Sequence, residues 1–136
     1  MTTTENVHGA AWAWVAGLFE GEGSAVNYLQ IGGPNAGRRN RMIVISSTDR
    51  DVLEQAQSIW GAGTIRADVK EQPDHYKQAY KLTVSKWADS ERIARAMYRW
   101  LGSRRRGQVD NFLAYPPQAQ VRAPFGNQNA TERRAA

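Results

Sequence analysis

Two glutamates near the N-terminus are the first residues in the chain whose type and spacing could do chemistry. Glu20 and Glu22 close a strongly apolar stretch that predicts a helix over residues 10–22. The helix dipole disfavours negative charge in the last turn by roughly 0.3–1 kcal/mol for each acid. Residues 1–37 contain no Lys or Arg, so no basic neighbour in the sequence offsets this cost. Because acids that violate a local rule often serve function, we take the pair as a candidate site.

A stripe of small residues runs along the same predicted helix. Ala13, Gly17 and Gly21 recur every four residues, so they share one face and leave it without side-chain bulk. Two copies of such a helix can pack closely about a two-fold axis. The two Glu22 carboxylates would then lie near each other and repel unless a cation neutralises them. The alternative is that Gly23 is only a helix C-cap and both glutamates are solvated.

Paired carboxylates of this kind favour a particular metal chemistry. Hard oxygen ligands suit Mg²⁺ (or Mn²⁺), which is held together with waters and substrate phosphates. Such an ion can activate a water and stabilise the leaving oxygen in phosphodiester cleavage. The motif therefore predicts a divalent-metal site shared by two copies of the chain.

The remaining elements predict one mixed domain. We predict strands over 24–31, 39–47, 64–70 and 76–84 and helices over 10–22, 49–60, 87–101 and 104–115. Thr48 is the expected N-cap of the second helix. Ile65 and Leu82 alternate with Arg66 and Lys81, so the last two strands each have one apolar and one charged face. The predicted fold class is α+β, an antiparallel sheet with helices on one face and a cationic face left open.

Composition indicates a single domain, and the charge indicates either a polyanionic partner or an ordinary solvated basic surface. The 136 residues carry a net charge of +5, and residues 38–106 hold fifteen of the eighteen Lys and Arg. The absence of Cys excludes a disulfide scaffold, a zinc finger and a thiol nucleophile. No apolar run approaches the roughly 18 residues of a membrane span. We divide the chain into a lead (1–9), a domain (10–115) and a flexible tail (116–136), and expect a cytoplasmic, nucleoid-associated protein without membrane contact.

The string Val-Ala-Gly-Leu-Phe-Glu-Gly-Glu-Gly at 15–23 resembles the signature of the LAGLIDADG homing endonucleases. Two glutamates replace the two aspartates of the signature, and four of the nine letters match, at Ala16, Gly17, Leu18 and Gly23. The order of elements over 10–115 is also the family's. The resemblance implies an αββαββα fold and a metal-dependent double-strand DNA endonuclease. A single motif implies a homodimer that cuts a long, roughly palindromic site, as in intron or intein homing.

The resemblance also implies roles for individual residues. Glu22 matches the acid that binds the metal, and the Gly21 carbonyl matches a further ligand. Ser47 stands where the family often has a Gln that positions water, and Arg105 where it often has a basic residue. Glu22, Ser47 and Arg105 are therefore the catalytic candidates. Glu20 matches a position that caps the partner helix, which puts the dimer interface at Ala13, Gly17, Glu20 and Gly21.

Polar and basic residues of the strands, with one turn residue, are the candidates for groove and phosphate contacts with DNA. They are Gln30, Arg38, Arg39, Arg41, Arg66, Lys70, Lys77 and Lys81. The alternative function is a non-cleaving DNA-binding regulator or an RNA-binding intron maturase on the same fold. It stays open because Ser47 departs from the family's Gln and Glu22 from its Asp. A plain dimeric structural protein is disfavoured by the basic middle region.

Overall fold

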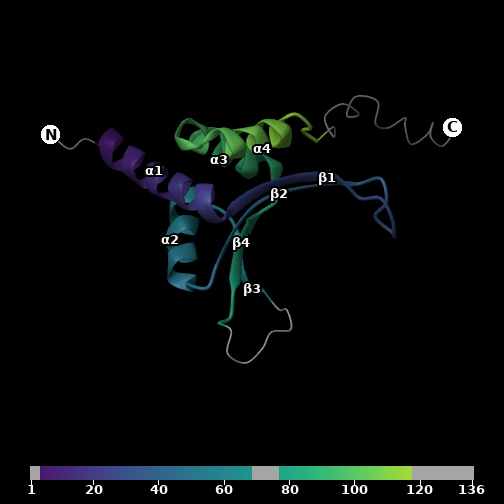
Figure 1. Cartoon of the computed structure of the whole chain (residues 1–136), viewed down its shortest axis with the longest axis horizontal. Helices are drawn as coiled ribbons and strands as arrows, with labels where there is room; N and C mark the ends of the chain where they lie inside the picture. The colour runs from purple at the N-terminus through teal and green to yellow at the C-terminus, as the bar shows by residue number, and fades with distance from the viewer. Residues whose placement is uncertain (1–3, 69–76, 118–136) are drawn as a thin grey trace.

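The computed structural model describes residues 4–68 and 77–117 of the chain. Figure 1 shows an α+β fold in which the helices lie on one side of a four-stranded sheet. The elements in chain order are α1 (Thr4–Glu22), β1 (Gly23–Leu29), β2 (Arg39–Ser47), α2 (Arg50–Trp60), β3 (Thr64–Ala67), β4 (Tyr80–Val84), α3 (Trp87–Met97), the 3₁₀ helix η1 (Tyr98–Trp100) and α4 (Ser103–Leu113). The predicted fold class and order of elements are confirmed.

Several element boundaries differ from the prediction. α1 begins at Thr4, so part of the expected lead belongs to the first helix. The last two strands are shorter, since β3 ends at Ala67 and β4 begins at Tyr80. Residues 69–76, which include the predicted outer strand ends, lie outside the described residues.

The N-cap of α2 is Asp49 rather than the predicted Thr48. The Ser47 hydroxyl oxygen accepts a hydrogen bond from the Asp49 backbone N–H at 3.0 Å. This local turn competes with helical backbone geometry and keeps residue 48 out of the helix. Asp49 itself has an extended conformation, with φ −106° and ψ 102°.

The strands are antiparallel and lie in the order β1-β2-β4-β3. The register pairs Ala25 with Ile43, and Leu82 with both Ile45 and Ile65, so these apolar residues share the face that the helices cover. The sheet is curved: β1 and β2 run across Figure 1, whereas β4 and β3 run down it. The helices lie on the outer side of this curve, and the concave face is open.

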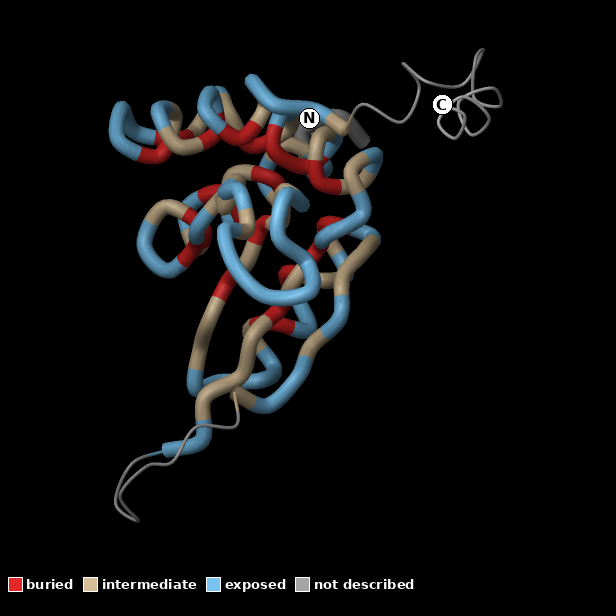
Figure 2. Tube along the Cα trace, turned by 90° about the vertical axis from the view of Figure 1, so that its right-hand side faces the viewer, coloured by how far each residue is buried: buried red, intermediate tan, exposed pale blue. Residues whose placement is uncertain are grey.

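The core lies between the helices and the covered face of the sheet, where Figure 2 shows the buried segments concentrated. Its fully buried side chains include Val15, Phe19, Ile43, Ile45, Leu53, Trp60, Leu82, Ile93, Met97, Val109 and Phe112. Burying each large apolar side chain contributes about 1.5–3 kcal/mol to folding. No helix within residues 4–68 and 77–117 combines the length and apolarity needed to cross a bilayer.

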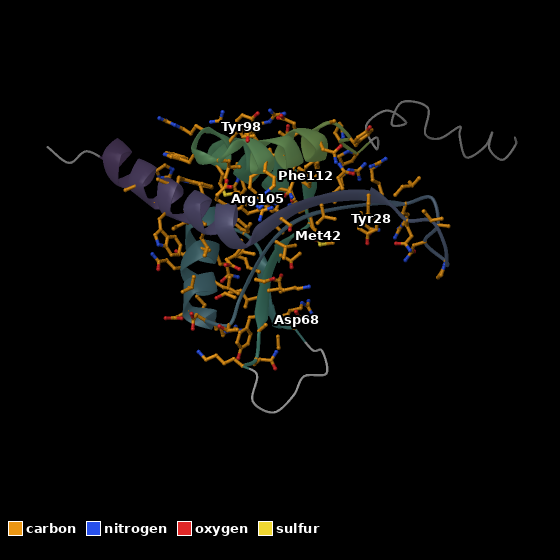
Figure 3. All side chains as sticks on the ribbon, in the orientation of Figure 1. Tyr28, Met42, Asp68, Tyr98, Arg105 and Phe112 are labelled. Carbon is orange, nitrogen blue, oxygen red and sulfur yellow. The ribbon has the colours of Figure 1, made fainter. Side chains whose placement is uncertain are left out.

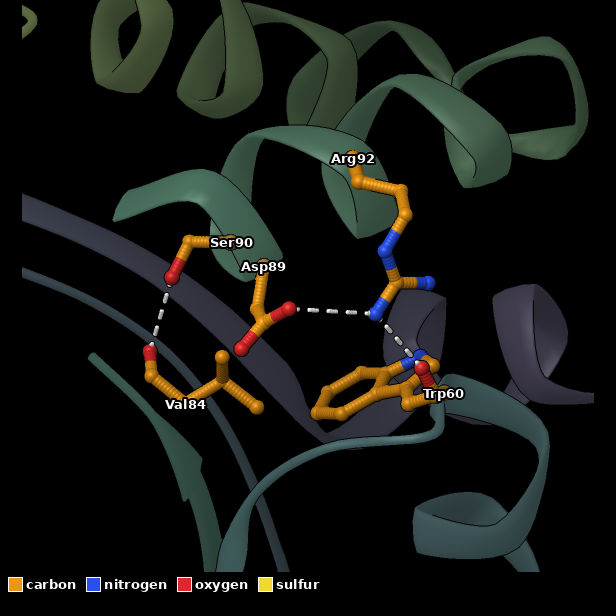
Figure 4. A network of polar contacts seen from close by, with 5 residues as sticks. All are labelled: Trp60, Val84, Asp89, Ser90 and Arg92. Atoms are coloured by element: carbon orange, nitrogen blue, oxygen red, sulfur yellow. Dashed lines mark hydrogen bonds and ion pairs between the residues drawn. The ribbon is translucent and has the colours of Figure 1, made fainter. Parts of the chain in front are cut away.

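Two polar contacts attach α3 to the elements beneath it (Figure 4). The buried Ser90 hydroxyl donates to the Val84 carbonyl at 3.1 Å, where β4 ends. The Arg92 guanidinium donates to the Trp60 carbonyl at 2.9 Å, at the end of α2. These bonds satisfy carbonyl groups that the ends of a strand and a helix leave without partners.

Candidate active site and nucleic-acid interface

The long helix α1 is buried on one side only. Trp12, Val15 and Phe19 face the core. On the opposite side Gly17 and Gly21 are exposed, and a Cβ added at either would meet no atom within 4 Å. Trp14 is 38% exposed, and Ala10 is exposed as well. The chain therefore leaves a smooth, mostly apolar helix face open to solvent. This agrees with the predicted small-residue stripe at Gly17 and Gly21, whereas Ala13 is half-buried.

The passage from α1 into β1 is tight. Gly23 is the first residue of β1, and a Cβ there would collide with the ring of Phe19. Gly23 is not among the glycines with positive φ, so it is not a left-handed helix C-cap. Its role is instead to let the strand pass directly over the Phe19 ring. This close approach fixes the direction in which the chain leaves Glu22.

Glu22 lines an open cleft of about 520 Å³ between the end of α1, the end of β2 and the start of α2. The cleft is bordered by Leu18, Glu22, Ser46, Ser47, Thr48, Asp49, Val52 and Ala79. The structure therefore brings together two of the predicted catalytic residues, Glu22 and Ser47. It also adds a second carboxylate, Asp49, which the sequence analysis missed. The signal available was the Ser-Thr-Asp sequence before a helix, which is typical of N-caps.

The donor set of this cleft fits a hard divalent cation only in part. Glu22 is exposed and makes no hydrogen bond or ion pair with the described residues. The Gly21 carbonyl belongs to the last turn of α1, where no intrahelical donor reaches it. Carboxylate and carbonyl oxygens are the ligands that Mg²⁺ prefers. Among the described residues, however, no three His, Cys, Asp or Glu side chains cluster as a metal site. The described residues of one copy therefore do not by themselves make a complete metal site.

Glu20 and Arg105 join the end of α1 to the start of α4. A Glu20 carboxylate oxygen accepts from the backbone N–H of Gly102, the N-cap of α4, at 2.8 Å. The Arg105 Nε donates to the Glu20 carbonyl at 3.1 Å. Glu20 was expected to cap the partner's helix, but its carboxylate caps α4 of its own chain. Arg105 is 7% exposed and does not border the Glu22 cleft.

The expectation that Arg39 and Arg41 lie on the open face of the sheet is wrong. Side chains alternate along a strand, and both arginines share the covered face with Ile43 and Ile45. Arg39 donates to the Asn27 side-chain oxygen at 2.8 Å, and Arg41 donates to the Tyr115 carbonyl at 2.6 Å. Partial burial and the neighbouring charge of Arg39 lower the pKa of Arg41.

Within the described strands, the basic side chains of the open face lie on β3 and β4. Arg66 and Lys81 face each other there in register, and the Lys81 ammonium lies 4.0 Å from an Asp68 carboxylate oxygen. The β1–β2 half instead carries Val26, Tyr28, Met42 and Val44, none of which belongs to the core. Figure 3 shows Tyr28 and Met42 directed into the concave side, away from α3 and α4.

The other predicted DNA contacts lie at the ends of the strands. Gln30 continues the β1–β2 ladder, with its backbone N–H bonded to the Arg38 carbonyl at 2.7 Å. Arg38 itself is exposed, and so is Lys77. Lys70 lies outside the described residues. No residue-level observation tests DNA contact by any of them, so these remain predictions.

The chain thus folds as a curved antiparallel sheet with an open concave face, with helices on its outer side and an acid at the end of its first helix. The sequence profile of the LAGLIDADG-like domain matches residues 10–98, which is more than half of the chain. The chain therefore belongs to the LAGLIDADG family. A search among curated proteins finds no match.

Several solved structures share the fold. The homing endonuclease I-CvuI, in complex with its target in the presence of Ca, superposes with a TM-score of 0.58 at 18% identity, over 76% of this chain and 64% of that one. The group I intron-encoded homing endonuclease I-CeuI, complexed with DNA, superposes with a TM-score of 0.56 at 16% identity, over 97% of this chain and 60% of that one. The homing endonuclease I-TnaI superposes with a TM-score of 0.57 at 19% identity, over 76% of this chain and 69% of that one. The chain thus spans less than two thirds of I-CvuI and I-CeuI, and at these identities the likeness shows the fold.

Proposed function

We propose that this protein is a site-specific DNA endonuclease that depends on Mg²⁺ or Mn²⁺ and acts as a homodimer. Its duplex would lie along the open concave face of two sheets. The observation that carries the proposal is the position of Glu22, which ends the exposed small-residue face of α1 and lines the cleft beside Ser47. An interface along that face would place both copies of Glu22 next to the bound duplex.

The exposed face of α1 supports an isologous dimer. Gly17 and Gly21 have open space above them, so the backbone of a second α1 can approach closely. Such packing would also cover Trp14, which is otherwise 38% exposed. In a two-fold interface each residue meets its own copy or a symmetric partner. The incomplete metal site of one copy would then be completed by the other copy and by a DNA phosphate.

Each site residue has a distinct role in this proposal. Glu22 and the Gly21 carbonyl would hold the ion, which supplies an activated water and stabilises the leaving oxygen when bound. The Ser47 hydroxyl would position water at the edge of the cleft. Arg105 would stabilise phosphate charge, and it is a poor proton shuttle because a guanidinium stays protonated.

The family resemblance supports a homing role, in which the cut site marks the insertion point of an intron or intein. I-CeuI, which shares the fold, is encoded by a group I intron. We propose the same kind of context for this chain, with double-stranded DNA as its partner.

A second candidate function is a DNA- or RNA-binding protein on the same fold that does not cut, such as a regulator or an intron maturase. One observation favours it: the Ser47 hydroxyl oxygen already accepts a hydrogen bond from the Asp49 N–H, so it has less freedom to hold a water. Duplex binding without cleavage across divalent metals would support this candidate.

The decisive experiment is cleavage of a plasmid that carries a site selected by the protein. Wild-type protein with Mg²⁺ should linearise this plasmid, and Glu22→Gln should bind the site without cutting because it removes the anionic ligand. Glu54→Gln is a matched control, since Glu54 is exposed on α2 and its one ion pair with a described residue is to Arg50. Undiminished cleavage by Glu22→Gln would show that Glu22 does not hold the ion.

A further inference from the structure

The β1–β2 half of the open face carries more apolar surface than phosphate binding requires. The register places Val26 opposite Met42, and Tyr28 opposite Asn40. Val26 and Met42 are half-buried, and Tyr28 is 49% exposed, although none of them belongs to the core. Phosphate contacts come from basic and polar groups and read no sequence. Apolar side chains gathered on a DNA-facing surface therefore indicate contacts with the bases.

The side-chain amide of Asn40 lies next to this apolar surface and is held in place by hydrogen bonds. The Asn40 Nδ2 donates to the Gln30 Oε1 at 3.1 Å, and the Gln30 Nε2 donates to the Gly32 carbonyl at 3.3 Å. The Asn40 Oδ1 and the second hydrogen of its Nδ2 have no partner among the described residues. Gln30 thus holds the Asn40 amide in place with one free acceptor and one free donor. This preorganisation lowers the entropy lost when the amide binds a ligand.

We propose, resting on the DNA-binding function proposed above, that the β1–β2 half of the face selects A·T base pairs. Val26 and Met42 fit the thymine methyl group, which is the apolar feature of the major groove. The free acceptor and donor of Asn40 match the adenine N6 amino group and N7 in a bidentate contact. A G·C pair placed against Val26 and Met42 would lose water from its polar edge without gaining hydrogen bonds, which disfavours it.

The fold also sets where these pairs fall relative to the cut. β1 begins immediately after Glu22 and rises about 3.3 Å for each residue. Val26 then lies about 13 Å along the strand from Glu22, and the Tyr28–Asn40 pair about 20 Å. Where the strand follows the groove, at about 3.4 Å per base pair, these distances correspond to roughly four and six base pairs. The dimer repeats both positions on the other side of the two-fold axis.

The test is selection of bound duplexes from a fully randomised library, with the full-length protein and no divalent metal, followed by sequencing. We expect two symmetric blocks enriched in A·T, with adenine preferred at the outer position. Asn40→Ala should reduce that outer adenine preference about tenfold and leave the inner block unchanged. Asn40→Arg should shift the outer preference to guanine, because arginine pairs with guanine O6 and N7. Gln55→Ala, on the exposed side of α2, is the matched control and should select the wild-type blocks.

The outcomes separate the two proposals. Retained duplexes with G·C or no preference in these blocks would overturn the inference and leave DNA binding intact. An unchanged outer preference in Asn40→Arg would show that Asn40 does not read the base. If the library yielded no retained duplex at all, the proposed function would fail and the inference with it.

Discussion

The Nε of Arg105 donates a hydrogen bond to the Glu20 carbonyl oxygen at 3.1 Å, so that α4 holds the last turn of the helix that ends at Glu22. Arg105 is only 7% exposed and has no ion pair within the described part of the chain. The side-chain nitrogens of Arg105 are nevertheless not sealed from solvent. They can therefore meet an anion from outside the chain, such as the DNA phosphate of the complex proposed above.

Substitution of Arg105 separates its structural role, the hydrogen bond that links α4 to α1, from its proposed role at a DNA phosphate. Arg105→Gln removes the charge together with one hydrogen bond, so the free energy of unfolding should change by no more than about 1 kcal/mol. Duplex cleavage should fall at least tenfold, because the variant lacks the positive charge that we propose stabilises phosphate charge. Chemical denaturation and a cleavage time course measure the two effects. If cleavage stayed at the wild-type rate, Arg105 would be a purely structural link between α1 and α4.

The exposed glycine face of α1 predicts that one added side chain prevents dimerisation. Gly17→Leu has open space in the isolated chain, so the protomer should fold normally. In an α1–α1 interface the new side chain would keep the backbones apart, and sedimentation equilibrium should detect a monomer. Gly107→Leu is the matched control, since a Cβ at Gly107 on α4 also meets no atom within 4 Å. A dimer that persists in Gly17→Leu would place the interface elsewhere.

The two faces of the sheet predict different consequences for two basic residues. Lys81 lies on the open face, so Lys81→Ala should lower the salt dependence of duplex binding by about 0.9 in the slope of log K against log salt concentration. Arg41 lies on the covered face and binds the carbonyls of Tyr115 and Pro116. Arg41→Ala should therefore leave the slope unchanged and cost about 1 kcal/mol of stability. Equal slopes for the two variants would contradict this placement of the faces.

The local patterns of the sequence were sufficient to predict much of the fold. Local backbone preferences are visible in three places. The apolar run before Glu22 predicts a helix, the segment at 32–37 predicts a turn, and the alternation around Ile65 and Leu82 predicts strands. The family resemblance named Glu22 and Ser47 together, and the structure places both residues on the border of one cleft. Their catalytic roles stay predictions.

Other features depend on relationships that local patterns do not contain. The bond between Glu20 and Gly102 joins residues far apart in the sequence, so the capping of α4 could not be foreseen. The position of Arg39 and Arg41 on the covered face could have been predicted from the sequence, because both alternate in phase with Ile43 on β2. Their charge suggested the open face, but strand periodicity was the stronger physical constraint.

The passage at Gly23 predicts a steep cost for the smallest possible substitution. Gly23→Ala would bring a methyl group against the Phe19 ring, which is itself fully buried in the core, and protein cores are closely packed. Overpacking of this kind typically costs about 1–3 kcal/mol of unfolding free energy. Gly107→Ala provides the contrast: it lies inside α4 with no atom within 4 Å, so replacing a helical glycine there should stabilise the protein by about 0.5–1 kcal/mol. Urea denaturation of both variants measures the difference. If Gly23→Ala were as stable as the wild type, the strand could not pass directly over Phe19. Another contact would then fix the direction in which the chain leaves Glu22.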